Sequence, residues 1–235
     1  MNHLSVWTQR GHNTATTVDY QARQQLLDIQ FTPYYSSDPQ TYDQAVQSSL
    51  RLSYQRTLLY SDADGTPTTG LDPLAVRPAS GSMPPLPIAS ESYDRLSVDP
   101  EGLVVNADGS FWVSDEYGPS ICAFPRSSSA SKAAKVDPTL LPSPPPADRF
   151  SAEGKLLSTI TQPYAVLPYT NGRLNFTSET QPTTGRSGNQ GFEGLTASAD
   201  GKMLWALLQS ATVQDGGRDD SQSAGLASPS HPLLT

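Results

Sequence analysis

Four acidic side chains are the residues of this sequence whose types and spacing could do chemistry. Glu101 and Glu193 each open a Glu-Gly-Leu triplet, and Asp115 and Glu116 end a Trp-Val-Ser-Asp-Glu run. Carboxylates brought together from separate parts of a chain suit a hard cation such as Ca²⁺, which takes several oxygen ligands in flexible geometry. They could also hold a general base or a metal-bound water. We therefore expect all four residues to be catalytic, with Glu101, Glu193 and Asp115 as ligands of a Ca²⁺ cofactor.

The adjacency of Asp115 and Glu116 limits this hypothesis. Neighbouring residues of a strand point to opposite faces of the sheet, so both cannot face one site if the strand continues through them. We expect one of the two to cap or bridge to a neighbouring element. For Glu101 and Glu193 a structural role is the alternative, in which their carboxylates accept backbone N–H bonds where the strands begin.

Other catalytic chemistries have little support in the sequence. The three histidines, His3, His12 and His231, lie near the ends of the chain, whereas a serine nucleophile needs a positioned base. There is no Gly-x-Ser-x-Gly elbow, Walker loop or dinucleotide fingerprint. Ser114 and Ser120, near the second acidic pair, are therefore poor candidates for a nucleophile.

The composition is acidic and excludes several classes of partner. Lys and Arg number 15 against 23 Asp and Glu, which gives a net charge of −8. This balance argues against nucleic-acid binding and a polybasic membrane anchor, and no apolar run approaches the roughly 20 residues of a membrane span. The lone Cys122 excludes an internal disulfide and a cysteine zinc site. The first ten residues lack the order of a secretory signal, so these observations alone predict an intracellular protein with a small-molecule substrate.

The acidic residues belong to a strand–turn–strand unit that occurs twice. The strands are predicted at 101–105 and 111–115 in the first copy, and at 192–197 and 204–208 in the second. Trp112 and Trp205 are expected to pack in the core between units. The copies are 92 residues apart, which fits two propeller blades of about 40–50 residues each. We predict an all-β fold, an incomplete β-propeller-type array of antiparallel hairpins, in which Glu101 and Glu193 converge on one end of the channel. The alternative is that such hairpins recur in any all-β protein.

The remaining segments set the predicted domain limits. We expect a flexible lead-in at 1–25, a domain at 26–217 interrupted by a low-complexity insert at 125–148, and a disordered tail at 218–235. The insert and the tail are rich in Ser, Ala and Pro, a composition that buries too little apolar surface to fold. Further strands are predicted at 26–35, 56–60, 120–124, 156–160 and 164–167, with a helix after Asp38, a plain turn at 62–65 and a surface excursion at 66–90.

Two segments carry a family resemblance. Residues 99–118 (DPEGLVVNADGSFWVSDEYG) and 191–210 (GFEGLTASADGKMLWALLQS) resemble the phytase-like domain described as "esterase-like activity of phytase", in particular its fungal members. The resemblance covers roughly 28–124 and 149–217. It implies a β-propeller-type fold, a secreted or otherwise extracytoplasmic location, and a hydrolase of phosphate or carboxylic esters.

The resemblance also bears on individual residues. By motif, the family's acidic positions correspond to Glu101, Asp115, Glu116 and Glu193. In a secreted protein the sequon Asn175-Phe176-Thr177 becomes an acceptor for glycosylation at Asn175.

The chain departs from the family pattern after Cys122. Family members run almost directly from the Ser-Asp-Glu-Tyr-Gly strand into an Arg-Phe-Ser-x-Glu-Gly segment, but here residues 123–148 intervene. Our hypothesis is that this stretch is translated intron and that the tail after Gly217 is read past a splice site or out of frame. The chain is then a truncated propeller with exposed sheet edges. Mature message that retains these bases would contradict the hypothesis.

Three classes of function follow from this reading. The first is a metal-assisted hydrolase of phosphate or carboxylic esters, with Ca²⁺ polarising the substrate. The second is a lactonase-like hydrolase of sugar acids. The third is a non-catalytic propeller that binds a ligand on its loops, because fold does not fix function.

Overall fold

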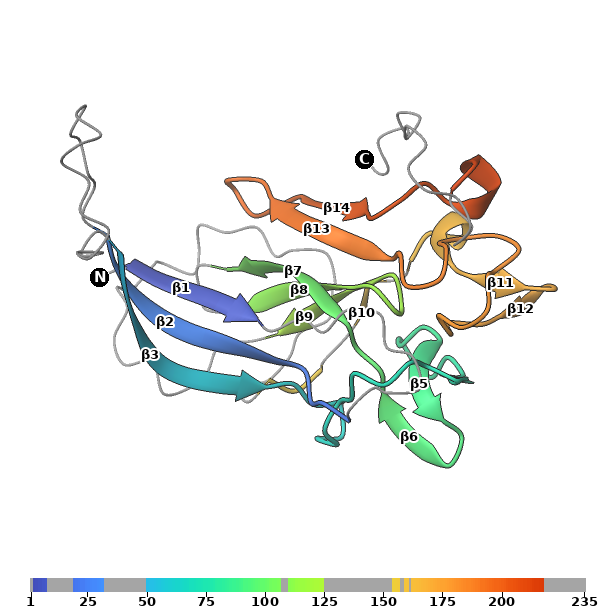
Figure 1. Ribbon diagram of the computed structural model, residues 1–235, viewed down its shortest axis with the longest axis horizontal. Coiled ribbons are helices and arrows are strands. Elements are labelled where there is room, and N and C mark those ends of the chain that lie inside the picture. Colours follow the sequence, from blue (N-terminus) through green and yellow to red (C-terminus); the bar gives the residue numbers. More distant parts are fainter. Residues whose placement is uncertain are drawn as a thin grey trace, which may run out of the picture. The chain divides into compact units, whose positions relative to one another are not determined.

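The computed structural model describes residues 2–7, 19–31, 50–106, 110–124, 154–156, 159–160 and 162–217. The predicted all-β array of antiparallel hairpins is confirmed (Figure 1). The chain forms two compact units, one made of Met1–Thr8 and Arg23–Leu59, the other of Gln9–Ala22 and Tyr60–Thr235. The helical turns of the described part are two short 3₁₀ segments, η3 (Tyr164–Val166) and η4 (Val213–Asp215). No described helix is long and apolar enough to span a membrane.

The first unit is a three-stranded antiparallel sheet. Its strands are β1 (Asn2–Trp7), β2 (Arg23–Phe31) and β3 (Leu50–Leu59), in the order β1-β2-β3. β1 and the start of β2 fall in the segment 1–25 that was expected to be flexible. β1 pairs with β2 in antiparallel register. The helix predicted after Asp38 lies outside the described residues, except for its end at Leu50.

The second unit begins with a small sheet where a surface excursion at 66–90 was predicted. The strands β4 (Ala75–Arg77), β5 (Leu86–Ser90) and β6 (Tyr93–Leu96) pair in the order β4-β5-β6. The prediction was wrong because β5 buries the side chains of Leu86, Ile88 and Ala89. The high Pro and Gly content of residues 66–90 is typical of loops, so this short buried strand was not predicted.

The largest sheet of the second unit carries the first predicted hairpin. Its strands are β7 (Pro100–Val105), β8 (Phe111–Asp115), β9 (Ser120–Phe124) and β10 (Thr159–Ile160), in the order β10-β9-β8-β7. β13 (Phe192–Ala197) and β14 (Leu204–Leu208) form the second predicted hairpin. In the sequence between β10 and β13, β11 (Tyr169–Thr170) and β12 (Arg173–Leu174) form a short antiparallel pair. The strand predicted at 164–167 is instead η3, whose backbone bonds, such as Val166 N to Pro163 O, span three residues.

Strand register confirms that the two hairpins are copies of one unit. Val104 pairs with Trp112 in the first, and Thr196 pairs with Trp205 at the corresponding positions of the second. Each copy also has a β-bulge at its Glu-Gly pair. The tryptophans differ in burial: Trp112 is half-buried, whereas Trp205 is 42% exposed, so the prediction of core packing was wrong for Trp205.

Buried aromatic and aliphatic side chains form the core of the second unit. They include Tyr60, Phe111, Val113, Tyr117, Leu156, Val166 and Phe176, all 2% exposed or less. The predicted plain turn at 62–65 is confirmed, since Asp62 N donates to Thr66 O and Gly65 has a φ of 93°. The insert at 125–148 and the tail at 218–235 lie outside the described residues. The arrangement of blades around a channel and the domain limits remain predictions. So does the hypothesis that residues 123–148 are translated intron and that the tail after Gly217 is read past a splice site or out of frame.

Candidate metal centre

The two β-bulges bring the repeated Glu-Gly pairs against one another. In the first hairpin Glu101 and Gly102 together oppose Ser114. The Ser114 hydroxyl accepts a hydrogen bond from Gly102 N at 2.6 Å and donates one to the carbonyl oxygen of Glu193 at 3.0 Å. Gly102 has no room for a side chain, because a Cβ there would lie 2.5 Å from Cβ of Leu195. Bulges commonly redirect a side chain near an active site. Here the two bulged Glu-Gly pairs lie in contact with one another.

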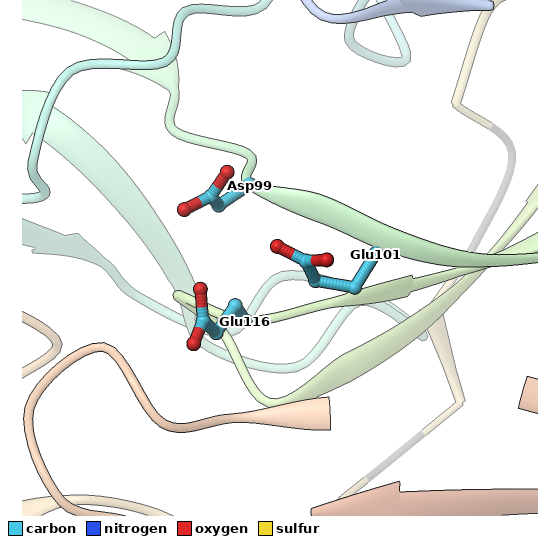
Figure 2. Close-up of side chains that lie close together, drawn as sticks. All are labelled: Asp99, Glu101 and Glu116. Atoms are coloured by element: carbon cyan, nitrogen blue, oxygen red, sulfur yellow. The ribbon is translucent and has the colours of Figure 1, made fainter. Parts of the chain in front are cut away.

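Three carboxyl groups converge beside the first bulge. Asp99 directly precedes β7, Glu101 lies on the β7 bulge, and Glu116 lies in the turn after β8. One carboxylate oxygen from each lies within 4.8 Å of the others. Figure 2 shows the three carboxyl groups turned toward a common space. The backbone helps to hold them together, since Glu116 N donates to Asp99 O at 3.0 Å.

Two of these carboxylates are buried with oxygens that no hydrogen bond satisfies. Asp99 is 3% exposed and Glu116 is 1% exposed. Asp99 Oδ2 and Glu116 Oε1 have no hydrogen-bond partner among the described residues. Burying a charged oxygen without a partner is costly, so such atoms call for a proton or a bound cation. The orphaned oxygens and the all-oxygen donor set fit a hard metal ion.

Burial and mutual repulsion raise the pKa of both groups. For Glu116, burial first and then the charges of Asp99, Glu101 and Glu193 raise the pKa to about 9. For Asp99, burial first and then the charges of Asp115 and Glu193 raise the pKa to about 7, while the neighbouring Glu116 carboxyl acts to lower it. Without a cation the cluster therefore retains a proton at neutral pH. Glu193 acts on it through charge but is not one of the three convergent residues.

Asp115 fixes the backbone of the cluster. Its Oδ1 accepts a hydrogen bond from Asp99 N at 2.8 Å, and its Oδ2 accepts one from Gly118 N at 2.7 Å and another from Ser120 Oγ at 3.4 Å. Burial raises the pKa of Asp115 to about 6, while the donated N–H bonds and Arg186 act to lower it. Of the adjacent acidic pair, Glu116 faces the cluster and Asp115 caps the turn. The assignment of Asp115 as a metal ligand remains a prediction.

A buried arginine clamps the turn that carries Glu116. Arg186 is 1% exposed, and its guanidinium donates to the carbonyl oxygen of Tyr117 at 2.6 and 3.2 Å. It also donates to Phe176 O at 2.6 Å and to Ser187 O at 2.9 Å. Burial lowers the pKa of Arg186 to about 10, so the group stays charged at neutral pH. The clamp joins the Glu116 turn to the chain that precedes β13.

The loop of residues 186–191, which follows from Arg186 to β13, packs directly on Glu116 at Gly191. A Cβ on Gly191 would lie 2.1 Å from the carbonyl oxygen of Glu116. Nearby, Asn189 Nδ2 donates to Glu116 Oε2 at 2.9 Å. The loop therefore contacts Glu116 at both its backbone and its carboxylate.

The predicted glycosylation residue, Asn175, directly precedes Phe176, whose carbonyl oxygen accepts a hydrogen bond from Arg186. Asn175 is half-buried, and its side-chain oxygen accepts a hydrogen bond from Thr177 N at 3.2 Å. The Thr177 hydroxyl donates to Asp72, which also accepts a bond from Ser178 N at 2.8 Å. Glycosylation at Asn175 remains a prediction.

Sequence reasoning missed two residues of the site, Asp99 and Asn189. Asp99 had a usable signal, because it is an acidic residue two positions before Glu101, where the first predicted hairpin begins. Asn189 had none, since its contact with Glu116 joins positions 73 residues apart.

Comparisons with known proteins identify the family of this chain. Residues 17–229 match the family "Phytase-like: Esterase-like activity of phytase". The chain is 35% identical over 232 residues to an uncharacterized secreted protein of Arthroderma benhamiae, in an alignment that covers 88% of this chain and 40% of that protein. The chain thus spans 40% of the length of this curated relative. No solved structure matches. The chain belongs to the phytase-like family, which is described by its esterase-like activity.

Proposed function

We propose that this chain carries the metal site of a secreted hydrolase that cleaves small phosphate or carboxylic esters. Asp99, Glu101 and Glu116 would hold the metal, and Ca²⁺ is the ion that their chemistry favours. The observation that carries the proposal is the convergence of three carboxylates. Asp99 and Glu116 are almost fully buried, and each of these two has an oxygen that lacks a hydrogen-bond partner in the described part of the chain.

The choice of Ca²⁺ rests on the donor atoms. The convergent group offers oxygen alone, without histidine or cysteine. Zinc prefers nitrogen and sulfur ligands, and Mg²⁺ demands a near-ideal octahedron. Ca²⁺ accepts six to eight oxygens in irregular geometry, which suits ligands on a bulge and a turn.

Family membership and net charge support the type of substrate. The family is described by esterase-like activity. The chain has a net charge of −8, so an anionic ester would approach this acidic cluster only when a cation neutralises it. A bound cation would supply a Lewis acid for a carbonyl or phosphoryl oxygen.

The acidic residues then divide the work. Asp99, Glu101 and Glu116 bind the cation, and Asp115 positions Asp99 through its backbone N–H. Glu193 is half-buried and is not one of the three convergent residues. We assign it the role of general base toward water or of a further ligand.

The named relative supports the proposed location. The Arthroderma benhamiae protein is named as secreted. An extracellular Ca²⁺ site can operate with a dissociation constant of about 10⁻⁴–10⁻³ M. A partly buried cluster of three carboxylates can provide an affinity in this range.

The test combines unfolding with turnover on the full 235-residue chain. Ca²⁺ should raise the melting temperature of the metal-free protein, because a ligand that binds only the native state stabilises it. Hydrolysis of p-nitrophenyl phosphate or p-nitrophenyl acetate should require Ca²⁺ and be lost in Glu193→Gln. The surface variant Glu91→Gln serves as the matched control.

Three outcomes would overturn the proposal. Calcium-dependent stability without cleavage of either ester would indicate a binding module. Cleavage of a sugar-acid lactone alone would indicate a lactonase. The lack of a calcium response in unfolding would remove the metal site.

A further inference from the structure

Asn189 places an uncharged oxygen beside the carboxylate cluster. Its Nδ2 donates to Glu116 Oε2 at 2.9 Å. Its Oδ1, attached to the same amide carbon, is buried and has no hydrogen-bond partner in the part of the chain that the structure describes. An amide oxygen in this state is costly to bury, and a cation at the neighbouring carboxylates would satisfy it.

The position of Asn189 is set by the backbone. Asn189 has a φ of 47°, in the left-handed region that asparagine tolerates better than most residues. Gln190 N closes a turn on Ser187 O at 3.1 Å, and Gly191 lies flush against the Glu116 carbonyl. The backbone of residues 187–191 therefore presents the Asn189 side chain to Glu116.

We propose that Asn189 is a neutral ligand of the cation held by Asp99, Glu101 and Glu116. This inference rests on the metal site proposed above. Side-chain amide oxygens are regular ligands of Ca²⁺, and a neutral ligand adds coordination without adding to the repulsion among the carboxylates.

The experiment counts the water molecules on a bound lanthanide. Tb³⁺ replaces Ca²⁺ in oxygen sites, and its luminescence lifetimes in H₂O and D₂O give the number of coordinated waters. Asn189→Gly removes the side chain without backbone strain, since glycine readily adopts a positive φ. Asn189→Asp keeps an oxygen at the same place.

A second asparagine provides the matched control. Asn171 also has a positive φ, 52°, and is exposed in the turn between β11 and β12. Asn171→Gly therefore repeats the same substitution in the same backbone region without touching the cluster.

We expect Asn189→Gly to add one water to the bound Tb³⁺ and to weaken its affinity roughly tenfold, in the range found when metal-site residues are removed. Asn189→Asp should keep the hydration number of the native protein, and Asn171→Gly should match the native protein in both quantities. An unchanged hydration number in Asn189→Gly would overturn the ligand role, even if the affinity falls, and would leave the carboxylate site standing. The lack of Tb³⁺ binding by the native chain would overturn the metal site itself.

Discussion

The carboxylate of Asp115 holds Asp99 in place through the Asp99 backbone. Oδ1 of Asp115 accepts the hydrogen bond from Asp99 N at 2.8 Å, and its other oxygen accepts bonds from Gly118 and Ser120. Asp99 itself keeps Oδ2 without a hydrogen-bond partner in the described structure. One buried carboxylate is thus satisfied within the protein, and the adjacent one is left for a ligand.

Replacing Asp115 by asparagine should damage both the fold and the site. The amide offers one acceptor oxygen, so one of the N–H groups that Asp115 now satisfies loses its partner. An unsatisfied buried group costs about 1–3 kcal/mol. We expect a lower urea midpoint in Asp115→Asn and weaker Ca²⁺ binding. Asp94→Asn, at a carboxylate that is 59% exposed in a surface ion pair, should change stability by less than about 1 kcal/mol, and an equal loss in both variants would contradict the role of Asp115.

The repeated Glu-Gly pairs predict opposite outcomes for equivalent glycines. A Cβ on Gly102 would meet Leu195 at 2.5 Å and Ser114 Oγ at 2.6 Å, whereas a Cβ on Gly194 finds its nearest neighbour at 3.4 Å. Gly102→Ala should lower the free energy of unfolding by about 1–3 kcal/mol, the usual range for overpacking. Gly194→Ala should stay within about 1 kcal/mol of the native protein. Similar urea midpoints for the two variants would contradict the stacking of the two hairpins.

Local sequence chemistry was enough to predict the repeated hairpins. The second hairpin has the predicted bounds, because alternating residues flank a turn whose Gly201 takes a φ of 68°. The pairing of β1 with β2 was not predicted, because a local pattern does not reveal a distant partner strand. The buried strand β5 was not predicted either, although its partners β4 and β6 are its neighbours in sequence. A short apolar segment between prolines has the local pattern of a loop.

The site was predicted in part, for similar reasons. Glu101 and Glu116 lie together as carboxylates of the expected type, but the divergent roles of Asp115 and Glu116 depend on where the β8 strand ends. Asp99 and Glu101 lie on either side of Pro100, the first residue of β7, and both carboxylates lie beside Glu116. The contact with Asn189 is set by tertiary packing, which spacing along one strand does not show.

The stability of the metal-free protein should fall as the pH rises. The pKa values of Asp99 and Glu116 are raised in the native state to about 7 and about 9, from ordinary values of 3.8 and 4.5. Between about pH 4 and 9 the native state therefore binds more protons than the unfolded chain, so stability decreases with pH in this window. Burial raises the pKa of Asp115 to about 6, which contributes in the same direction.

Urea midpoints at pH 5, 7 and 9 provide the measurement. They should decline with pH in the metal-free protein, and saturating Ca²⁺ should reduce the decline by stabilising the ionised carboxylates. Glu116→Gln should flatten the metal-free profile between pH 7 and 9. A metal-free midpoint that stays constant or rises with pH would show that the carboxylates are not buried together.

Calorimetric titration of Ca²⁺ into the metal-free chain tests the central claim most directly. The carboxylate cluster predicts one Ca²⁺ bound per chain, with affinity at least about tenfold weaker in Glu116→Gln. Glu91→Gln, a surface change of the same kind, should bind as the native chain does. Equal binding by the native chain and Glu116→Gln, or no binding by either, would contradict a metal centre at Asp99, Glu101 and Glu116.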